Sequence, residues 1–410
     1  MAFLGGSSAS AGILFISLLA GCGTDNIRQS KVIFRDSAGV SIVENHAPQW
    51  TDTENWSISD TPTIDIGERT GAPQYLFDGV KDLMRLANGN ILVADGASKE
   101  LRIYDEAGKH IISFGGKGDG PGEFQDPAWV GQLPDGSIIV YDSQHARLSM
   151  FSIDGEFIRS ASLDPIDGAI PAARGMFADG SLLVSPGRSQ VFSAGTSVRR
   201  DTVRYVRVDS NGEVMGTMGT YPADTEIVIV NSDGRPWVMR MNVPFAPKTF
   251  VAVHQDRLYI GNSEAYEIAV VSLTGELSEI IRARYVPRQL SADDVKQYKE
   301  YELAKPASDL LRQMKSVALS KMPFPDVIPA YDGLLVDLEG NLWVKESRRP
   351  GEMQPRWTVF DPRGRMLGTV ATPLDFDIYE VGGDWLLGVW TDEVGVEHVR
   401  VYGIEKSAQG

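Results

Sequence analysis

Cysteine, histidine and basic residues are all in short supply in this chain of 410 residues. It holds a single cysteine, Cys22, which excludes an intramolecular disulfide and a Cys-based zinc cluster. The five histidines show no metal-binding spacing such as His-Glu-x-x-His: His46, His110, His145, His254 and His398. Lys and Arg number 39 against 55 Asp and Glu, and the net charge of −16 excludes an electrostatic nucleic-acid binder.

Long hydrophobic runs are also missing, because the apolar stretch at 9–20 is too short to span a bilayer. The stretch is typical of the core of a secretory signal peptide, although no Lys or Arg precedes Arg28. It ends in Leu19-Ala20-Gly21-Cys22, which resembles the lipobox of bacterial lipoproteins, where the cysteine is lipidated and becomes the N-terminus. The resemblance implies a signal peptide at 1–21, a flexible tether at 22–37 and lipidation of Cys22. It also implies an extracytoplasmic, lipid-anchored protein, with the outer membrane or periplasmic face favoured.

Glycine, in contrast, is abundant. The chain has 42 glycines, and many of them stand in one recurring turn. An Asn-Gly pair, Asn88-Gly89, precedes an apolar run, and similar turns stand at 135–136, 179–180, 255–256, 339–340 and 382–384. Asn-Gly and Asp-Gly between strand-like runs indicate hairpins, because a type I′ turn needs positive φ at both central residues. The sequence therefore predicts six copies of one hairpin.

A second hairpin follows the first, so that each repeat holds four strands. The spacing of 19 residues between Gly89 and Gly108 recurs between Gly136 and Gly155. First turns lie 47 and then 44 residues apart at Gly89, Gly136 and Gly180, which is the period of a β-propeller blade. Longer gaps predict insertions at 188–201, at 220–247 and, with helical character, at about 290–320. Ser291 and Ser308 are expected to cap two helices there, which we expect to pack on the side or rim of the propeller.

The C-terminal copy, 376–402, supplies only three strands of a blade. The segment 63–66 can supply the fourth, because a propeller removes its open edge by closing the ring. The sequence thus predicts an all-β, six-bladed β-propeller at 38–405, in which an N-terminal strand closes the last blade and a small helical insertion lies between blades four and five.

The stretch 80–124 resembles an NHL-type propeller repeat, most specifically in its end, Gly120-Pro121-Gly122-Glu123-Phe124. From about residue 60 onward the chain is similar to bacterial six-bladed β-propeller lipoproteins related to that group. The glycine-rich loop lacks the spacing of a phosphate-binding loop, so we interpret it as an inter-blade loop that Phe124 anchors. The resemblance implies the fold and no particular reaction.

Candidate functional residues stand just after the second strand of each blade, where propeller loops open on one face around the channel. The predicted ligand-binding face comprises nine residues: Asp95, Asp142, His145, Arg147, Asn262, Tyr266, Glu346, Arg348 and Asp392. Four of them, Asp95, Asp142, Asn262 and Glu346, carry oxygen ligands of the kind Ca²⁺ prefers. The alternative is that these Asp and Asn side chains bond to their own loop backbone.

No nucleophile–base pair or cofactor motif marks an enzyme, so no catalytic residue is identified and no cofactor is expected, although Ca²⁺ stays open. The sequence favours a membrane-tethered, monomeric binding scaffold for a protein, peptide or glycan. The alternative is a Ca²⁺-dependent hydrolase or lactonase that uses the central channel. Structural support of an envelope complex is a third hypothesis.

Overall fold

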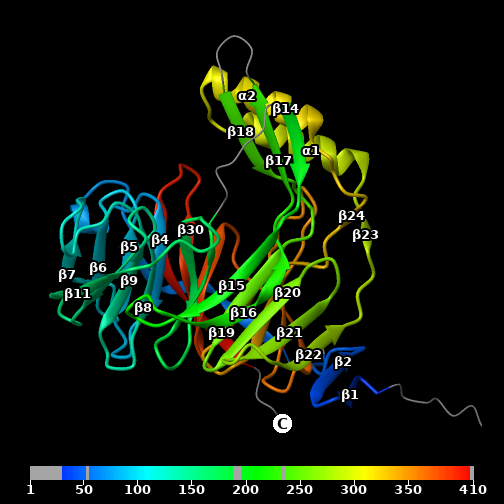
Figure 1. The fold of residues 1–410 in the computed structure, drawn as a ribbon, viewed down its shortest axis with the longest axis horizontal. Helices are drawn as coiled ribbons and strands as arrows, with labels where there is room; N and C mark the ends of the chain where they lie inside the picture. Colours follow the sequence, from blue (N-terminus) through cyan, green and yellow to red (C-terminus); the bar gives the residue numbers. More distant parts are fainter. Residues whose placement is uncertain (1–29, 52–54, 188–194, 232–236, 407–410) are drawn as a thin grey trace, which may run out of the picture. The chain divides into compact units, whose positions relative to one another are not determined.

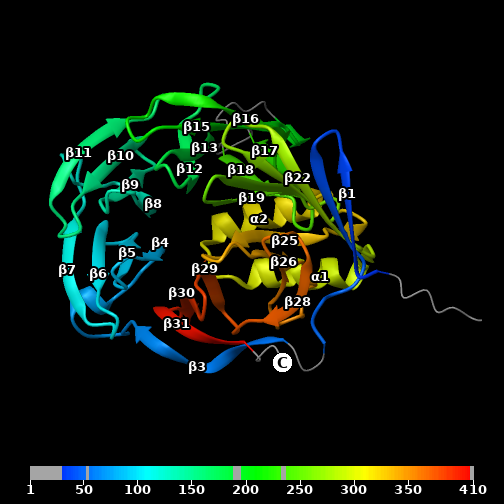
Figure 2. The ribbon, with the colours of Figure 1, turned by 90° about the horizontal axis from the view of Figure 1, so that it is seen from below.

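The computed structural model describes residues 30–51, 55–187, 195–231 and 237–406. Within residues 31–410, which form one compact unit, six β-sheets stand in a ring (Figures 1 and 2). Each sheet contains four antiparallel strands that form one blade, and we number the blades one to six; the sheet of blade four has two further strands at its outer edge. The all-β fold predicted from the repeats is confirmed.

Blades one to three follow the hairpin repeat closely. Blade one holds β4 (Val80–Arg85), β5 (Ile91–Asp95), β6 (Glu100–Tyr104) and β7 (His110–Gly115). A short 3-10 helix, η1 (Pro73–Tyr75), precedes it. Blade two holds β8 (Pro127–Gln132), β9 (Ile138–Asp142), β10 (Arg147–Phe151) and β11 (Phe157–Ser162). Blade three holds β12 (Pro171–Met176), β13 (Leu182–Pro186), β15 (Thr202–Val208) and β16 (Val214–Pro222).

Blades four to six complete the ring. Blade four holds β19 (Thr249–His254), β20 (Arg257–Asn262), β21 (Glu267–Ser272) and β22 (Leu277–Ala283). Blade five holds β25 (Tyr331–Val336), β26 (Leu342–Glu346), β27 (Arg356–Phe360) and β28 (Met366–Ala371). Blade six holds β29 (Phe376–Val381), β30 (Trp385–Thr391), β31 (Glu397–Lys406) and β3 (Trp56–Ile66), so its fourth strand comes from the N-terminal part of the chain.

Four of the six repeated turns hold a glycine at positive φ, namely Gly89, Gly136, Gly180 and Gly340, and these four are not type I′ turns. In blade one Gly89 has φ 89°, whereas Asn88 is not among the residues with positive φ. The Gly89 N–H donates to the Leu86 carbonyl, and the Leu86 N–H donates to the Asn90 carbonyl. This pattern is a type I turn followed by a glycine bulge, which needs left-handed backbone at only one residue.

The second strand of each blade is buried on both faces, because each blade packs between two others. Ile91, Leu92 and Val93 of β5 are all 0% exposed. One face of β5 packs with blade two and the other with blade six, where Ile66 and Leu387 belong to the same core cluster. Phe124 is 0% exposed and packs between blades one and two, as predicted from the glycine-rich loop.

The insertions meet in one place, which we call the inserted module. It has a sheet of β14 (Gly195–Arg199), β17 (Glu226–Asn231) and β18 (Trp237–Asn242), and two helices, α1 (Ala292–Ala304) and α2 (Asp309–Lys321). These elements leave the ring at three points: within blade three, between blades three and four, and between blades four and five. A small sheet of β23 (Arg288–Gln289) and β24 (Val327–Ile328) flanks the helices.

The helices pack on the sheet of the inserted module and not on the side of a blade, which corrects the expectation from the sequence. Ala318 and Leu319 of α2 share a buried cluster with Ile227 and Ile229 of β17. Ser291 and Asp294 form a capping box at the start of α1, with the Ser291 N–H 2.8 Å from Asp294 Oδ2. Apolar burial between separate insertions is what makes the module one body.

The prediction of a flexible tether at 22–37 is wrong at its C-terminal end. Val32–Ser37, assigned to the tether from the sequence, form β1, which pairs with β2 (Val40–Asn45). Strand β2 then pairs in parallel with β22 at the outer edge of blade four. Cys22 and the predicted signal peptide lie outside the described residues, and no helix in the described part of the chain is long and apolar enough to cross a membrane.

Candidate functional site

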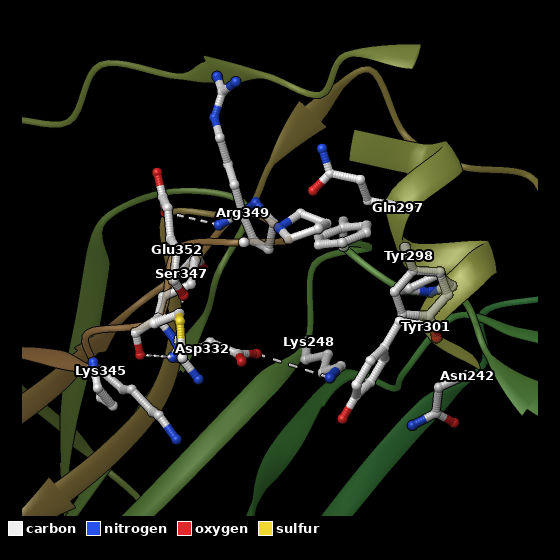
Figure 3. A pocket seen from close by; sticks show the side chains of 18 of the residues that line it. Asn242, Lys248, Gln297, Tyr298, Tyr301, Asp332, Lys345, Ser347, Arg349 and Glu352 are labelled. Carbon is white, nitrogen blue, oxygen red and sulfur yellow. Dashed lines mark hydrogen bonds and ion pairs between the residues drawn. The ribbon is translucent and has the colours of Figure 1, made fainter. Parts of the chain in front are cut away.

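A cleft of about 890 Å³ opens between the inserted module and the loops of blades four, five and six (Figure 3). The module contributes α1, and the ring contributes the segments before β19, β25 and β29 and the loop after β26. Its charged and aromatic lining comprises Phe245, Lys248, Tyr298, Tyr301, Asp332, Lys345, Arg348, Arg349, Glu352, Asp375, Phe376 and Asp377. This volume falls within the range of small-molecule sites.

Two lysines give the cleft a basic side at blades four and five. Lys345 lies on β26, and its ammonium stands 5.7 Å from the Trp357 ring without an ion-pair partner among the described residues. Its side chain lies along Gly333, where an added Cβ would come within 3.2 Å of the Lys345 Cβ. Lys248 Nζ lies 3.9 Å from an Asp332 carboxylate oxygen. One of the two cations, Lys248, thus has an acidic partner on this side, and Lys345 has none among the described residues.

Two aspartates give the cleft an acidic side at blade six. Asp375 and Asp377 flank the buried Phe376 at the start of β29, and both are exposed. Neither carboxylate has an ion-pair partner within the described ranges. Asp375 has a φ of 52°, and its carbonyl accepts from the Thr391 N–H at 3.0 Å, which fixes the loop that carries both acids.

Two tyrosines on α1 form the wall that faces the ring (Figure 3). Tyr298 is held by edge-on contacts with Phe245 and Phe324, at ring distances of 5.5 and 6.0 Å. Burial raises the pKa of the Tyr298 hydroxyl to about 12. Tyr301, one turn further on, is 65% exposed and stacks only with the Lys305 ammonium, at 4.5 Å. Tyr301 therefore offers a free aromatic surface.

The loop after β26 ties the inserted module to blade five. Arg349 reaches Asp294 at 3.5 Å and donates to the Gln289 carbonyl at 2.9 Å, while Glu352 pairs with Arg288 at 3.2 Å. Hydrogen bonds from the Ser291 backbone and hydroxyl lower the pKa of Asp294, and the Arg349 guanidinium adds to the effect. These pairs hold the two walls of the cleft together.

A buried hydroxyl adjoins this loop. Ser347 lines the cleft and is 6% exposed, and its Oγ makes no hydrogen bond to the described protein. An unpaired buried hydroxyl carries a desolvation cost. Because the Ser347 hydroxyl is already removed from water, a ligand group that reached it would gain a hydrogen bond, and the protein would lose little further hydration.

The predicted residues of blades one and two lie away from this cleft. Asp95 accepts from the Ser98 hydroxyl at 2.6 Å and the Asp78 N–H at 3.1 Å, and it lies 3.5 Å from Arg102. Arg147 donates to the carbonyl of Glu123 at 2.5 Å. Asp95 thus bonds within its own loop and to the segment before β4, and Arg147 holds the glycine-rich loop between blades one and two.

Asp142 and His145 form a bridge at the edge of a second cavity, of about 650 Å³. His145 Nδ1 lies 2.8 Å from Asp142, and Nε2 lies 3.0 Å from Asp119. Burial favours a higher pKa for Asp142, but hydrogen bonds from the Gln125 N–H and His145 outweigh it, and the pKa is lowered. Lys81, Lys99, Gln125, Asp126, Gln144 and His145 line the cavity, where Lys81 pairs with Asp126 at 2.9 Å.

Of the predicted residues in blades four to six, one lines the cleft and the others make contacts elsewhere in the ring. Asn262 accepts from Arg200 at 3.1 Å, and the Tyr266 ring packs in the core against Tyr331, where burial raises its pKa. Glu346 accepts from Thr358 at 3.3 Å, and Asp392 accepts from the N–H groups of its own turn, Val394 and Val396. Of the nine, Arg348 alone lines the cleft, where it donates to the Met353 carbonyl.

In the part of the chain that the structure describes, no three His, Cys, Asp or Glu side chains come together as a metal site would require. The four candidate Ca²⁺ ligands, Asp95, Asp142, Asn262 and Glu346, are each engaged in the local hydrogen bonds given above. The Ca²⁺ site stays a prediction from the sequence.

Two carboxyl groups lie between blades on the innermost strands. Asp82 on β4 accepts from the Val130 N–H of blade two at 2.9 Å, and Glu380 on β29 accepts from the Arg85 N–H of blade one at 2.7 Å. Burial raises the pKa of each to about 7, although these hydrogen bonds oppose the shift, and the charge of Glu380 raises that of Asp82 further.

The residues that shape the cleft were missed at the sequence level. A signal was present for Lys345, a cation directly after the apolar run Leu342-Trp343-Val344, and for Asp375 and Asp377, which alternate with Phe376. No signal placed Tyr301 opposite them, because that wall comes from an insertion whose position depends on long-range packing.

Comparison with known proteins supports the fold. Residues 75–232 match a family model described as a 6-bladed beta-propeller. A DUF4221 family member from Bacteroides vulgatus is 13% identical with a TM-score of 0.51, over 87% of this chain and 100% of that one. A Bacteroides fragilis protein whose name describes it as exported is 13% identical with a TM-score of 0.47, over 90% and 100%.

An enzyme is also among the similar structures. The virginiamycin B lyase of Staphylococcus aureus is 10% identical with a TM-score of 0.36, over 84% of this chain and 88% of that one. No curated protein matches the chain. At these identities the likeness concerns the fold alone.

Proposed function

We propose that this protein is a ligand-binding β-propeller of the cell envelope, and that it holds its ligand in the cleft between the inserted module and blades four to six. Cys22, in its lipobox-like context, would anchor the chain to a membrane on the extracytoplasmic side, at the outer membrane or periplasmic face. The pairing of β3 with β31 supports a ring closed by the N-terminal strand, as in the NHL-like propeller lipoproteins.

The cleft itself carries the proposal. Three insertions that leave the ring at different points form one wall, and Arg349 and Glu352 fix that wall to blade five. Unpaired charges face the space in between, at Lys345 on one side and at Asp375 and Asp377 on the other. Exposed charges without partners beside an exposed tyrosine are typical of a site completed by a ligand.

A binding role agrees with the lining better than catalysis does. Of the described residues that line the cleft, none is a histidine or a cysteine, so a nucleophile–base pair of the usual kind is not assembled there. The calcium-dependent hydrolase has no observation that favours it, since each of its four candidate ligands is hydrogen-bonded to other protein groups.

The test blocks the cleft. In a Cys22→Ser background, Met353→Cys places a thiol at a lining position that is 67% exposed, and Val214→Cys places one at the first residue of β16 in blade three, outside the lining. Both are alkylated with a bulky maleimide and screened by thermal shift against peptide and oligosaccharide panels. We expect ligands of the wild type to be lost from the blocked Met353→Cys protein and kept by the blocked Val214→Cys protein. If the ligands bind equally well to the two blocked proteins, the cleft is not the binding site.

A further inference from the structure

The charges of the cleft that lack an ion-pair partner differ in sign between blades five and six. Lys345 of β26 lies with Lys248 of the segment before β19, which pairs with Asp332, whereas the lining residues Arg349 and Glu352 are taken up by Asp294 and Arg288. The acidic side, Asp375 and Asp377, belongs to blade six. A ligand with one charge would meet repulsion on one side, whereas a ligand with opposite charges at its two ends would be attracted by both.

We propose, on the basis of the proposed function, that the cleft binds short peptides as zwitterions. The C-terminal carboxylate lies at Lys345 and Lys248, and the N-terminal ammonium lies at Asp375 and Asp377.

The size of the cleft agrees with a peptide of a few residues. A volume of 890 Å³ equals a cube about 10 Å on a side, and three extended residues also span about 10 Å. Pairing of a long strand along the cleft is disfavoured, because Pro244, Pro329, Pro350 and Pro355 in the lining have no N–H to donate. Recognition must therefore come from end charges and side-chain contacts.

The remaining lining provides for the side chains of such a peptide. Tyr301 offers an exposed ring, and Met353, 67% exposed, is a flexible and polarizable neighbour. Thioether and aromatic groups adapt to different apolar side chains. We therefore expect the end charges to fix the orientation of the peptide, and the sequence preference to be broad.

The experiment removes one end charge at a time. Binding of alanyl-phenylalanyl-alanine to the Cys22→Ser protein is measured by calorimetry, together with its N-acetyl form and its C-terminal amide. Each modification is expected to weaken binding at least about tenfold, which is about 1.4 kcal/mol. Rising salt is expected to weaken the free peptide most.

Charge variants assign each end to its side. In Lys345→Met the difference between acid and amide is expected to shrink to about threefold or less, with the N-acetyl penalty kept, and Lys248→Met is expected to act in the same direction. The double variant with Asp375→Asn and Asp377→Asn is expected to do the reverse: the N-acetyl penalty shrinks, and the difference between acid and amide is kept. Lys109→Met and Asp154→Asn, exposed charges outside the lining, are matched controls expected to behave as the wild type.

The outcomes separate the two proposals. Equal affinity for all three forms of the peptide overturns the zwitterion assignment. So does a Lys345→Met variant that no longer distinguishes the free peptide from either its N-acetyl form or its C-terminal amide. Absence of peptide binding while another ligand is lost on blocking Met353→Cys also overturns it, and leaves the binding function standing. If every ligand survives that block, the binding function fails as well.

Discussion

Asp82 makes the stability of the ring depend on pH in a direction opposite to that of most carboxylates. Its pKa is raised to about 7 by burial, from an ordinary value of 3.8. Between those values the folded protein binds more protons than the unfolded chain, so the free energy of unfolding falls as pH rises. The stabilising proton is held at pH 5 and lost by pH 8.

The size of the effect follows from the two pKa values. At pH 5 the proton contributes about 2.7 kcal/mol and at pH 8 almost nothing, so about 2.5 kcal/mol is lost over this window. With an unfolding entropy of about 2 cal/mol/K per residue, a chain of this length would lose about 3 °C in Tm. Glu380, also raised to about 7, contributes in the same direction.

Asp82→Asn tests this reasoning, because an amide resembles the protonated acid in shape and in its ability to accept from the Val130 N–H. We expect the variant to match the wild type at pH 5 and to exceed it in Tm by about 3 °C at pH 8, measured by calorimetry. Asp154→Asn, at an exposed hairpin turn, is the control. Wild-type and Asp82→Asn curves that run parallel from pH 5 to pH 8 would refute the argument.

Three further predictions concern the anchor, the core and the inserted module. Cys22→Ser is expected to release the protein from the membrane fraction, and unchanged fractionation would contradict lipidation. Phe124→Ala, at a 0% exposed position between blades one and two, is expected to cost about 3–5 kcal/mol in unfolding, and a loss below 1 kcal/mol would contradict its anchoring role. Ser291→Ala is expected to cost about 1 kcal/mol and to speed hydrogen exchange in the first turn of α1, while exchange in β5 stays unchanged.

The blades could be predicted from the sequence because their signals are local. A strand, a glycine turn and a second strand each lie within about ten residues, and Gly89 and Gly136 both have the positive φ that their turns require. The exact turn type could not be predicted, since a type I turn with a bulge and a type I′ turn use the same residue pairs.

The inserted module could not be predicted, because its core joins residues that are distant in sequence. Ile227 of β17 and Leu319 of α2 share one cluster, although almost two blades of chain lie between them. The hydrophobic pattern of α2 shows that one face is buried but does not show against what.

The candidate site was only partly predictable for the same reason. The sequence predicted polar residues at the ends of the second strands, but Asp95 and Asp142 accept from the N–H groups of Asp78 and Gln125, in the segments that lead into their blades. Short acidic side chains at loop starts do this readily. Lys345 and Asp377 have no such local partners, and a lack of local partners is the better guide to a ligand site here.

The most direct test of the account is a crystal structure of the Cys22→Ser protein soaked with alanyl-phenylalanyl-alanine. We predict density for the peptide between Tyr301 and the loops of blades four to six, with its carboxylate near Lys345 and its amino group near Asp375 and Asp377. Peptide density at the second cavity beside His145, with the cleft left free of peptide, would contradict the central claim.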